Sequence, residues 1–453
     1  MSGMIKAFGV STPAYPWDLV EEGVEKFLDG AIEHIGANSV FSPICYYWEE
    51  AAAFWWGGVM PHNKKIRRYF PEDGRFFVTP DKDCYKDTKI KPDRSIDPLL
   101  DNFESLAVLS QACKKRKMSM SVWFPVFKNP YLARKYPDCT PKDIFGGRQR
   151  HGLCPNHPDV IGYYLGTIRH IIRYYDIASI GLDKFGIEYW AGGCYGEGWY
   201  TGMNNGQEWA PDIDPQFLLL NTPCFCEHCA KQAQEWGFDW KKIRSRIQVL
   251  ADGCVERDAS VTMRLGQKGF FKGEAGLARL LLEEPEVYQW CRFKIQTMVE
   301  VARRIKELLR AEAPHVKVGA GLDPSVGSNF QRFRHYGWMY GTSLRDLAPV
   351  LDGISGSSGM SADEKYYMHM IDKEAVGDLC EFRGGDVHAV SPCGPEEVRE
   401  QIRMFDKVGS SAYCIFGYTW APLANLHAAR DMLFEIEQRM EQNNVRANET
   451  VGR

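Results

Sequence analysis

The most chemically informative motif is Cys224-Phe225-Cys226-Glu227-His228-Cys229, which places three cysteines in a C-x-C-x-x-C spacing. A tight turn of this kind brings soft sulfur ligands toward one point, as a metal ion requires. Zinc prefers four ligands, and a further cysteine, Cys154, lies upstream in a Cys-Pro-Asn-His-Pro run. We therefore predict a structural zinc site that pins a long loop beside an active site.

A second set of residues could supply carboxylate chemistry. Asp183 directly follows the apolar segment 177–182, so its side chain should open at the end of a strand. There it could act as a nucleophile, a general base or a stabiliser of an oxocarbenium ion. Glu188, in the same loop, could be a general acid with a raised pKa. Asp323 ends another apolar segment and is a similar candidate.

Aromatic residues are abundant, with 13 Trp and 21 Tyr in 453 residues. Flat side chains stack on the apolar faces of sugar rings and can hydrogen-bond their hydroxyl groups. In a large protein many aromatic residues fill the core instead. Lys184 could neutralise Asp183 or hold a group of the substrate. The residues that we expect to bind substrate are Tyr47, Trp48, Trp123, Lys184, Tyr189, His388, Tyr418 and Trp420.

The elements that would position these residues alternate between short apolar strands and amphipathic helices. The expected strands span residues 5–10, 39–44, 118–126, 177–182, 316–322, 351–355, 387–391 and 412–416. The clearest expected helices span residues 97–117, 158–175, 284–313, 395–408 and 423–440. Eight strands alternating with helices predict an α/β fold of the (β/α)8 TIM-barrel type.

A doubly wound sheet is the alternative fold. It would need a glycine-rich phosphate turn after the first strand, and the sequence has no G-x-G-x-x-G or P-loop motif. We predict one barrel over residues 1–442, with insertions at 49–96 and 184–283 and a polar C-terminal tail at 443–453. Asp352 and Asp386 begin their strands, at the face of a barrel that serves stability, so both are interpreted as structural.

Net charge, apolar stretches and cysteine distribution limit the classes of function that this sequence indicates. A formal net charge of -4 does not indicate a nucleic-acid-binding groove. The sequence has no 18-residue apolar stretch, and its N-terminus lacks the apolar core of a signal peptide. The 14 cysteines are dispersed in a way that suits reduced thiols in a cytoplasmic enzyme. We expect a small carbohydrate substrate, no nucleic-acid or membrane partner, and leave a homo-oligomer open.

Residues 146–240 resemble a known arrangement. The run Gly146–Arg150, the segment around Cys154, a strand ending in an acid, and the cysteine motif before Trp236 follow in the order found in glycoside hydrolase family 42 β-galactosidases. Related uncharacterised glycoside-hydrolase-like barrels are more similar still. The resemblance implies that a zinc ion is held by Cys154, Cys224, Cys226 and Cys229. Cys139 or Cys194 could replace Cys154.

The chain departs from that family at its catalytic positions. The family has an Asn-Glu pair at the end of strand four, where this sequence reads Lys184-Phe185, and strand seven has no terminal Glu. β-Galactosidase activity is therefore not carried over. We expect a glycoside-hydrolase-like enzyme that uses Asp183 with Glu188 or Asp323. The alternatives are a catalytically silent carbohydrate-binding barrel, or a sugar isomerase, epimerase or lyase built on His388, Asp183 and Asp323.

Overall fold

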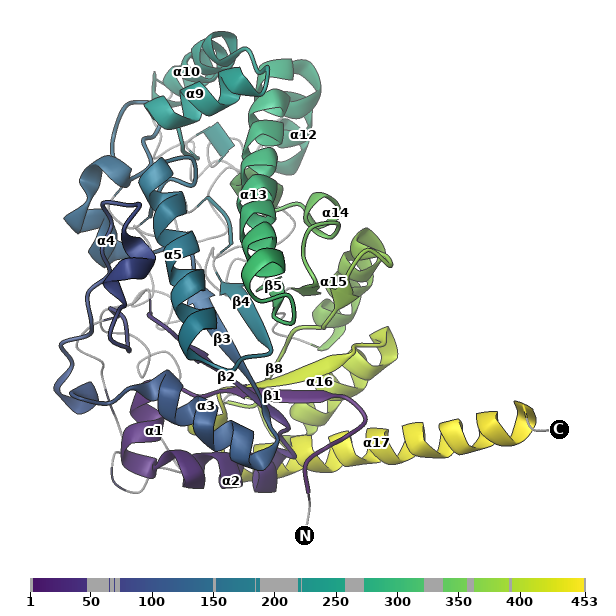
Figure 1. Ribbon diagram of the computed structural model, residues 1–453. Helices are drawn as coiled ribbons and strands as arrows, with labels where there is room; N and C mark the ends of the chain where they lie inside the picture. The colour runs from purple at the N-terminus through teal and green to yellow at the C-terminus, as the bar shows by residue number, and fades with distance from the viewer. Residues whose placement is uncertain are drawn as a thin grey trace.

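The computed structural model of the 453-residue chain describes residues 3–46, 65, 69, 74–149, 152–183, 185–187, 219–220, 222–256, 273–321, 337–356, 362–390 and 393–451. Over this part of the chain, strands and helices alternate from the N-terminus to the C-terminus (Figure 1). None of the described helices is long and apolar enough to cross a membrane.

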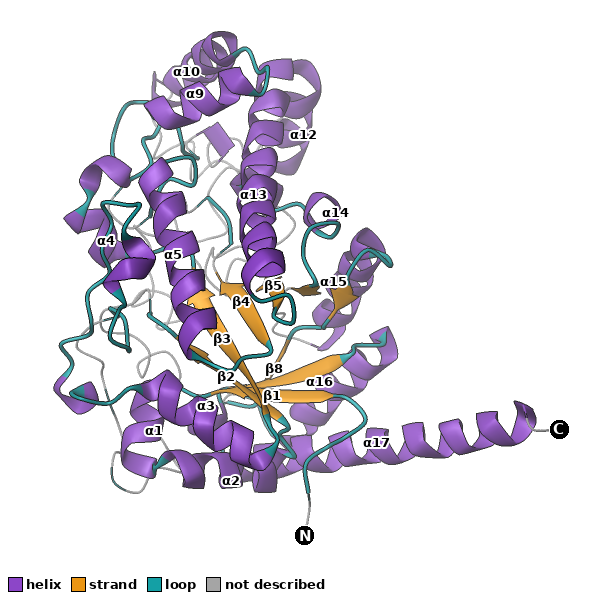
Figure 2. Ribbon diagram, in the orientation of Figure 1, coloured by secondary structure: helices purple, strands orange, loops and turns teal. Residues whose placement is uncertain are grey.

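The centre of the fold is one curled sheet in which every strand pairing is parallel (Figure 2). In the described residues it has nine strands in the order β7-β6-β5-β4-β3-β2-β1-β9-β8. Their bounds are β1 Gly9–Pro13, β2 Ser39–Pro43, β3 Ser119–Pro125, β4 Ser179–Asp183, β5 Lys317–Gly321, β6 Gly353–Ser355, β7 Glu381–Phe382, β8 Asp386–His388 and β9 Ala412–Phe416. A curled parallel sheet of this kind brings the carboxyl ends of its strands to one rim.

Helices cover the convex face of the sheet (Figures 1 and 2). They are α1 Pro16–Glu22, α2 Val24–Ile35, α3 Ser105–Arg116, α5 Pro158–Tyr174, α13 Pro285–Glu312, α15 Ala362–Val376, α16 Pro395–Val408 and α17 Leu423–Val451, with the shorter α4 Pro130–Lys135 and α14 Leu344–Leu347 in loops. The ends of α16 show why these segments are helical. Pro395 occupies the first turn, where its missing N–H costs nothing, and Gly409 ends the helix in the left-handed conformation.

The two faces of the sheet differ in side-chain size. Large apolar residues face the helices and are almost fully buried: Val10, Val40, Val122, Ile180, Leu182, Val318, Ile354, Val387 and Ile415. The alternating positions on the concave face are mostly small and include Ser11, Ser121, Ser179, Gly181, Gly319, Gly353 and Cys414. Because side chains alternate along a strand, this pattern places the main core between sheet and helices.

The first and last strands in the sheet order are close in sequence. β7 and β8 are separated only by residues 383–385, where Gly384 has a φ of 60°. The Gly356 N–H donates to the Gly384 carbonyl at 3.0 Å, and the Ser411 hydroxyl donates to the Phe382 carbonyl at 3.2 Å. The segment Glu381–His388 therefore contacts strands from both sides of the sheet.

Two predicted strands differ from the structure. The seventh was placed at 387–391, but pairing occurs at Glu381–Phe382 and Asp386–His388 because glycines interrupt one extended segment. The first was placed at 5–10, but β1 begins at Gly9. Ile5 is buried outside the sheet, where its N–H donates to the Gly36 carbonyl. β1 ends in Ser11, Thr12 and Pro13, so it does not have the apolar run from which a strand is usually predicted.

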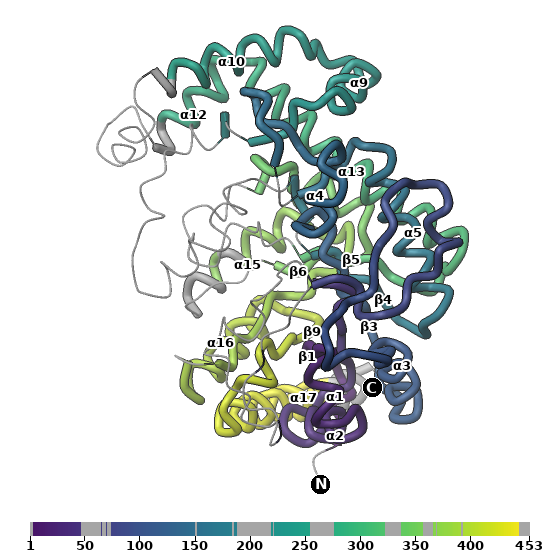
Figure 3. The backbone as a smooth tube through the Cα atoms, turned by 90° about the vertical axis from the view of Figure 1, so that its left-hand side faces the viewer, coloured from purple at the N-terminus to yellow at the C-terminus, as the bar shows by residue number. Residues whose placement is uncertain are grey.

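A second, smaller core lies at the end of the molecule opposite α2 and α17 (Figures 1 and 3). It contains α9 Glu227–Glu235, α10 Trp240–Glu256, α12 Gly273–Glu283 and the first half of α13. The ring of Phe225 stacks on Trp290 at 4.5 Å, and Trp240 contacts both rings. We call this second core and its helices the satellite lobe.

Candidate functional site

Aromatic rings gather at the carboxyl ends of β1, β2, β3 and β9. Tyr15 is at the centre, and it stacks on Trp17 with the ring centroids 4.9 Å apart. Its ring also contacts Tyr46 at 5.9 Å, Trp123 at 6.0 Å and Trp420 at 5.5 Å. Tyr15 and Trp17 are each only 1% exposed, whereas Tyr46 and Trp123 are half-buried. We call these five residues the aromatic cluster.

Asp183 is the last residue of β4, as the sequence predicted. Its carbonyl accepts a hydrogen bond from the Val126 N–H at 2.9 Å, so the strand end is anchored. Its carboxylate Oδ2 is buried and has no hydrogen-bond partner among the described residues. Asp183 is also among the groups that raise the pKa of Tyr15, after burial, Tyr46 and Asp18. The carboxylate thus lies within electrostatic range of the aromatic cluster.

Asp18 is a second carboxyl group at this rim, and no pattern in the sequence indicated it. The side chain is 1% exposed and accepts hydrogen bonds from the Thr419 hydroxyl at 2.8 Å and the Tyr15 N–H at 3.3 Å. Burial raises its pKa to about 7, although these two hydrogen bonds act to lower it. In sequence, Asp18 looked like an ordinary acidic residue in the first turn of a helix, so only its partner 401 residues away reveals its place.

Among the described residues, five buried polar atoms at this end of the sheet make no well-formed hydrogen bond: Tyr15 Oη, Trp17 Nε1, Trp420 Nε1, Asp18 Oδ1 and Asp183 Oδ2. Folded proteins satisfy most buried polar atoms, and exceptions call for an explanation such as a bound water or ligand. Three of the atoms are donors, and the others belong to carboxyl groups. This end of the sheet can therefore both donate hydrogen bonds to a ligand and accept them from it.

The structure places the other described candidates in different surroundings. Trp123 and Trp420 belong to the aromatic cluster. Tyr418 instead packs on Phe27 of α2 at 5.3 Å, away from the rings of the cluster. His388 lies on the concave face beside Phe416, and its main chain is held by Gln401. Six candidates lie outside the described residues: Tyr47, Trp48, Lys184, Glu188, Tyr189 and Asp323.

The predicted cysteine ligands converge as the C-x-C-x-x-C spacing indicated. Cys154, Cys224, Cys226 and Cys229 are all buried, and their ligand atoms lie within 4.8 Å of one another. The Sγ atom of Cys154 is 3.5, 3.6 and 3.7 Å from those of Cys226, Cys229 and Cys224. Four thiolates at the usual 2.3 Å from a tetrahedral zinc would be about 3.8 Å apart. This four-cysteine cluster could hold a metal ion.

The N–H groups that donate hydrogen bonds to the sulfur atoms would also stabilise thiolates. The backbone N–H groups of Lys142 and Cys226 donate to Cys224 Sγ at 3.4 Å, and the Asn156 amide donates to Cys229 Sγ at 3.3 Å. Hydrogen bonds from neighbouring thiols, Cys154 first, hold the pKa of Cys226 far below its usual range. Such outer contacts stabilise negative sulfur and orient metal ligands.

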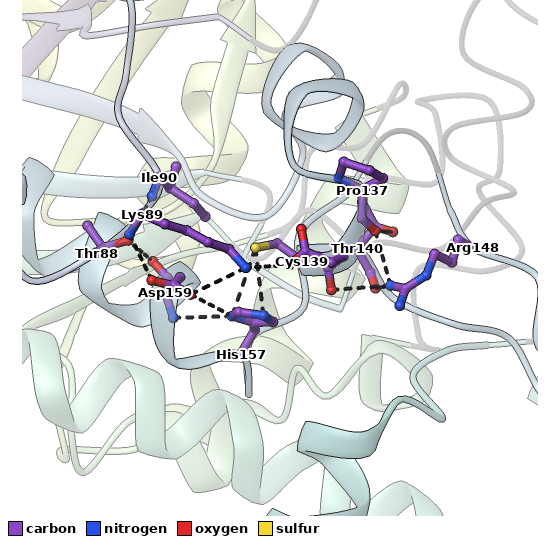
Figure 4. Close-up of polar contacts among 10 residues, drawn as sticks. Thr88, Lys89, Ile90, Pro137, Cys139, Thr140, Arg148, His157 and Asp159 are labelled. Atoms are coloured by element: carbon purple, nitrogen blue, oxygen red, sulfur yellow. Dashed lines mark hydrogen bonds and ion pairs between the residues drawn. The ribbon is translucent and has the colours of Figure 1, made fainter.

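A second group of possible metal ligands is Asp138, Cys139 and His157, and the Cys139 carbonyl accepts a hydrogen bond from the Cys154 N–H at 2.8 Å. Figure 4 shows Cys139 and His157 together with Lys89 and Asp159. The cation position of this group is already filled, because the Lys89 ammonium contacts the Asp138 carboxylate and lies 3.5 Å from that of Asp159. Cys139 Sγ is 3.7 Å from His157 Nε2. We interpret this group as an ion-pair network that ties residues 82–91 to the start of α5.

Comparisons with known proteins identify the fold. No family model matches the chain, and no curated protein matches it. Solved structures do. An α-L-fucosidase isoenzyme 2 from Paenibacillus thiaminolyticus aligns with a TM-score of 0.54 and 12% identity over 96% of this chain and 50% of its own. The PgaB (BpsB) glycoside hydrolase domain from Bordetella bronchiseptica aligns with a TM-score of 0.52 and 13% identity over 95% and 98%.

A β-galactosidase from Halorubrum lacusprofundi is also similar, with a TM-score of 0.51 and 14% identity over 94% of this chain and 57% of its own. The chain thus spans about half the length of the fucosidase and the β-galactosidase, and nearly all of the PgaB domain. At these identities the likeness concerns the fold alone. The curled parallel sheet with its covering helices is therefore a glycoside-hydrolase-like α/β fold.

Proposed function

We propose that this protein is a glycoside-hydrolase-like enzyme that acts on a sugar or glycoside at the carboxyl ends of its strands. The observation that carries the proposal is the set of five unpartnered buried polar atoms within and beside the aromatic cluster. Each such atom costs about 1–3 kcal/mol if it stays unsatisfied. A sugar offers both donors and acceptors for these atoms, and its C–H faces can stack on the rings.

Asp183 is the proposed catalytic carboxylate. Its unpartnered Oδ2 leaves it free to attack an anomeric carbon or to take a proton from water. A second carboxyl group must complete the pair, and Glu188 and Asp323 remain the proposed candidates. A separation of about 5 Å between the two would give a retaining mechanism, and about 6.5–9.5 Å an inverting one. We also propose that β1–β9 form a closed (β/α)8 barrel in which Glu381–His388 is the seventh strand.

The test is a panel of aryl glycosides and oligosaccharides assayed with the wild type and with Asp183→Asn. We expect at least one substrate to be cleaved, and the substitution to lower kcat at least about 100-fold because the acid–base or nucleophilic group is lost. The matched control is Asp176→Asn, the same change at the opposite end of β4, where the exposed Asp176 pairs only weakly with Lys114. Turnover that survives Asp183→Asn undamaged would remove Asp183 from the mechanism.

A carbohydrate-binding barrel without catalysis is the second candidate function. One observation favours it: Phe185 occupies the position where the resembled family has its catalytic Glu, and it is 2% exposed against Phe127. In that case sugars would raise the melting temperature of the wild type and of Asp183→Asn, but no glycoside would be cleaved. Thermal shift and turnover on the same panel distinguish the two functions.

We further propose that Cys154, Cys224, Cys226 and Cys229 hold one structural zinc ion. The sulfur spacing and the N–H donors around the cluster support zinc, which has no redox chemistry and accepts four thiolates. Bound there, the ion would cross-link the loop before α5 to the start of α9. Metal analysis of purified protein is expected to find about one zinc ion per chain.

A further inference from the structure

Glycines line up across three neighbouring strands on the concave face. Gly181 of β4 pairs with Gly319 of β5, and Gly319 pairs with Gly353 of β6. Arg383 fills the room that two of them leave. Its Nε is 2.8 Å from the position that a Gly353 Cβ would take, and its Nη1 is 3.9 Å from that of Gly319. Glu381 holds this guanidinium at 3.1 Å.

Gly181 is different, because no heavy atom of the described residues lies within 4 Å of where its Cβ would be. The same is true of Gly321, the last residue of β5. The pairing of Leu182 with Ala320, continued by one residue, places Gly321 beside Asp183. As far as the described residues go, the space next to Asp183 is therefore open on its own strand and on the neighbouring strand. We call it the Gly181–Gly321 space.

Two buried polar groups lie at this end of the sheet. Asp183 is two residues beyond Gly181 and shares its face of the strand, and its Oδ2 has no hydrogen-bond partner. Across the rim, the Tyr15 side chain is 99% buried; its hydroxyl makes no well-formed hydrogen bond among the described residues, although the Tyr46 hydroxyl is close enough to raise its pKa. Asp183 is also among the groups that raise the pKa of Tyr15, after burial, Tyr46 and Asp18. A ligand hydroxyl in the space could donate a hydrogen bond to the Asp183 carboxylate.

We propose that the Gly181–Gly321 space receives one monosaccharide ring of the ligand, that a ring hydroxyl donates a hydrogen bond to Asp183, and that the two glycines determine which rings fit. This inference rests on the proposed function and names the part of the substrate that the site holds. The absence of side chains at residues 181 and 321 is then a specificity feature. A Cβ at either position would occupy part of the volume of the ring and would meet no atom of the described residues within 4 Å.

The experiment substitutes Gly181 with Val. Neither glycine has a positive φ, and a Cβ at residue 181 meets no atom of the described residues within 4 Å, so the variant is expected to fold with an unchanged or higher melting temperature. Against the best substrate of the panel, kcat/KM is expected to fall at least about tenfold, since added methyl groups oppose a bound ring. Gly181→Ala and Gly321→Ala should give smaller losses in the same direction.

The control is Gly253→Val in α10, where a Cβ also meets nothing within 4 Å but which lies far from the rim in the satellite lobe. A Gly181→Val protein that melts normally and cleaves like the wild type would overturn the proposal. If Gly181→Val does not fold, the two alanine variants decide in the same way.

Binding separates this inference from the proposed function. Sugars that stabilise Asp183→Asn against heat, but do not stabilise the Gly181→Val,Asp183→Asn double variant, support the space as the ring site even if no glycoside is cleaved. Equal stabilisation of both proteins overturns the inference and leaves the proposed function standing. A panel in which no sugar is cleaved or stabilises any variant overturns both.

Discussion

Loss of the proposed zinc ion from the four-cysteine cluster is expected to unfold the satellite lobe and lower the melting temperature of the whole chain by more than 10 °C. Cys226→Ser should have the same effect, because it removes one of four ligands that lie within 4.8 Å of one another. Apparent binding free energies of structural zinc are on the order of 10 kcal/mol at neutral pH. This exceeds the cost of most single core substitutions, about 0.5–3 kcal/mol.

The lobe is vulnerable for a structural reason. The cluster joins Cys154, in the loop before α5, to the loop and first turn of α9, so it ties the lobe to the main core. Phe225, between two ligands, anchors the aromatic stack of the lobe on Trp290. Hydrogen exchange should therefore show loss of protection first in α9 and α10, while α16 and α17 stay protected.

The control for this substitution is Cys291→Ser. Cys291 is 3% exposed and belongs to the same lobe, but it lies outside the cluster. Cys291→Ser should lower the free energy of unfolding only by the cost of burying a hydroxyl in place of a thiol. Its metal content should stay at the wild-type level. A Cys226→Ser protein that keeps its metal and melts like Cys291→Ser would show that the cluster is no metal site.

Asp18→Asn is expected to make the protein more stable above pH 7 and to remove much of its loss of stability between pH 4 and pH 8. The folded-state pKa of Asp18 is raised to about 7 from 3.8, first because of burial. The folded protein therefore keeps a proton that the unfolded chain releases in this range. The stability that the folded state gains from keeping this proton on Asp18 is fully present below pH 4 and is lost as the pH rises through 7. The difference between these two pKa values corresponds to about 4 kcal/mol in the free energy of unfolding.

Urea unfolding at pH 5 and pH 8 checks this expectation. Asparagine keeps the shape of the side chain and can still accept the Thr419 and Tyr15 hydrogen bonds. Asp352→Asn is a comparison variant for which the expected change in stability has the opposite sign. Although burial raises the pKa of Asp352, hydrogen bonds from Lys306 and the Val318 N–H lower it overall, so this variant should lose stability at neutral pH. A wild type whose stability does not change between pH 5 and pH 8 would mean that Asp18 ionises normally.

Several elements were predictable from the sequence because local signals agreed. The helix Pro395–Val408 and the strand Ala412–Phe416 match their predicted bounds, since a proline, a glycine cap and an apolar run mark their ends. β4 ends at Asp183 as expected, because an apolar run is followed directly by an acid. The cysteine ligands were predictable for a similar reason, since three of them lie within six residues. The ion pair of Asp352 with Lys306 agrees with its interpretation as structural.

The remainder of the site depends on contacts that no local pattern encodes. The sequence by itself determined the alternation of strands and helices, the position of Asp183 and the types of the cysteine ligands, because each follows from neighbours a few residues away. Only the tertiary structure decided that Asp18 accepts hydrogen bonds from the Thr419 hydroxyl and the Tyr15 N–H. It also decided that Gly181 and Gly321 leave space beside Asp183 among the described residues. Curling the sheet brings β1 and β9 side by side, and burial there changes the pKa and hydrogen-bonding state of groups that look ordinary in the chain.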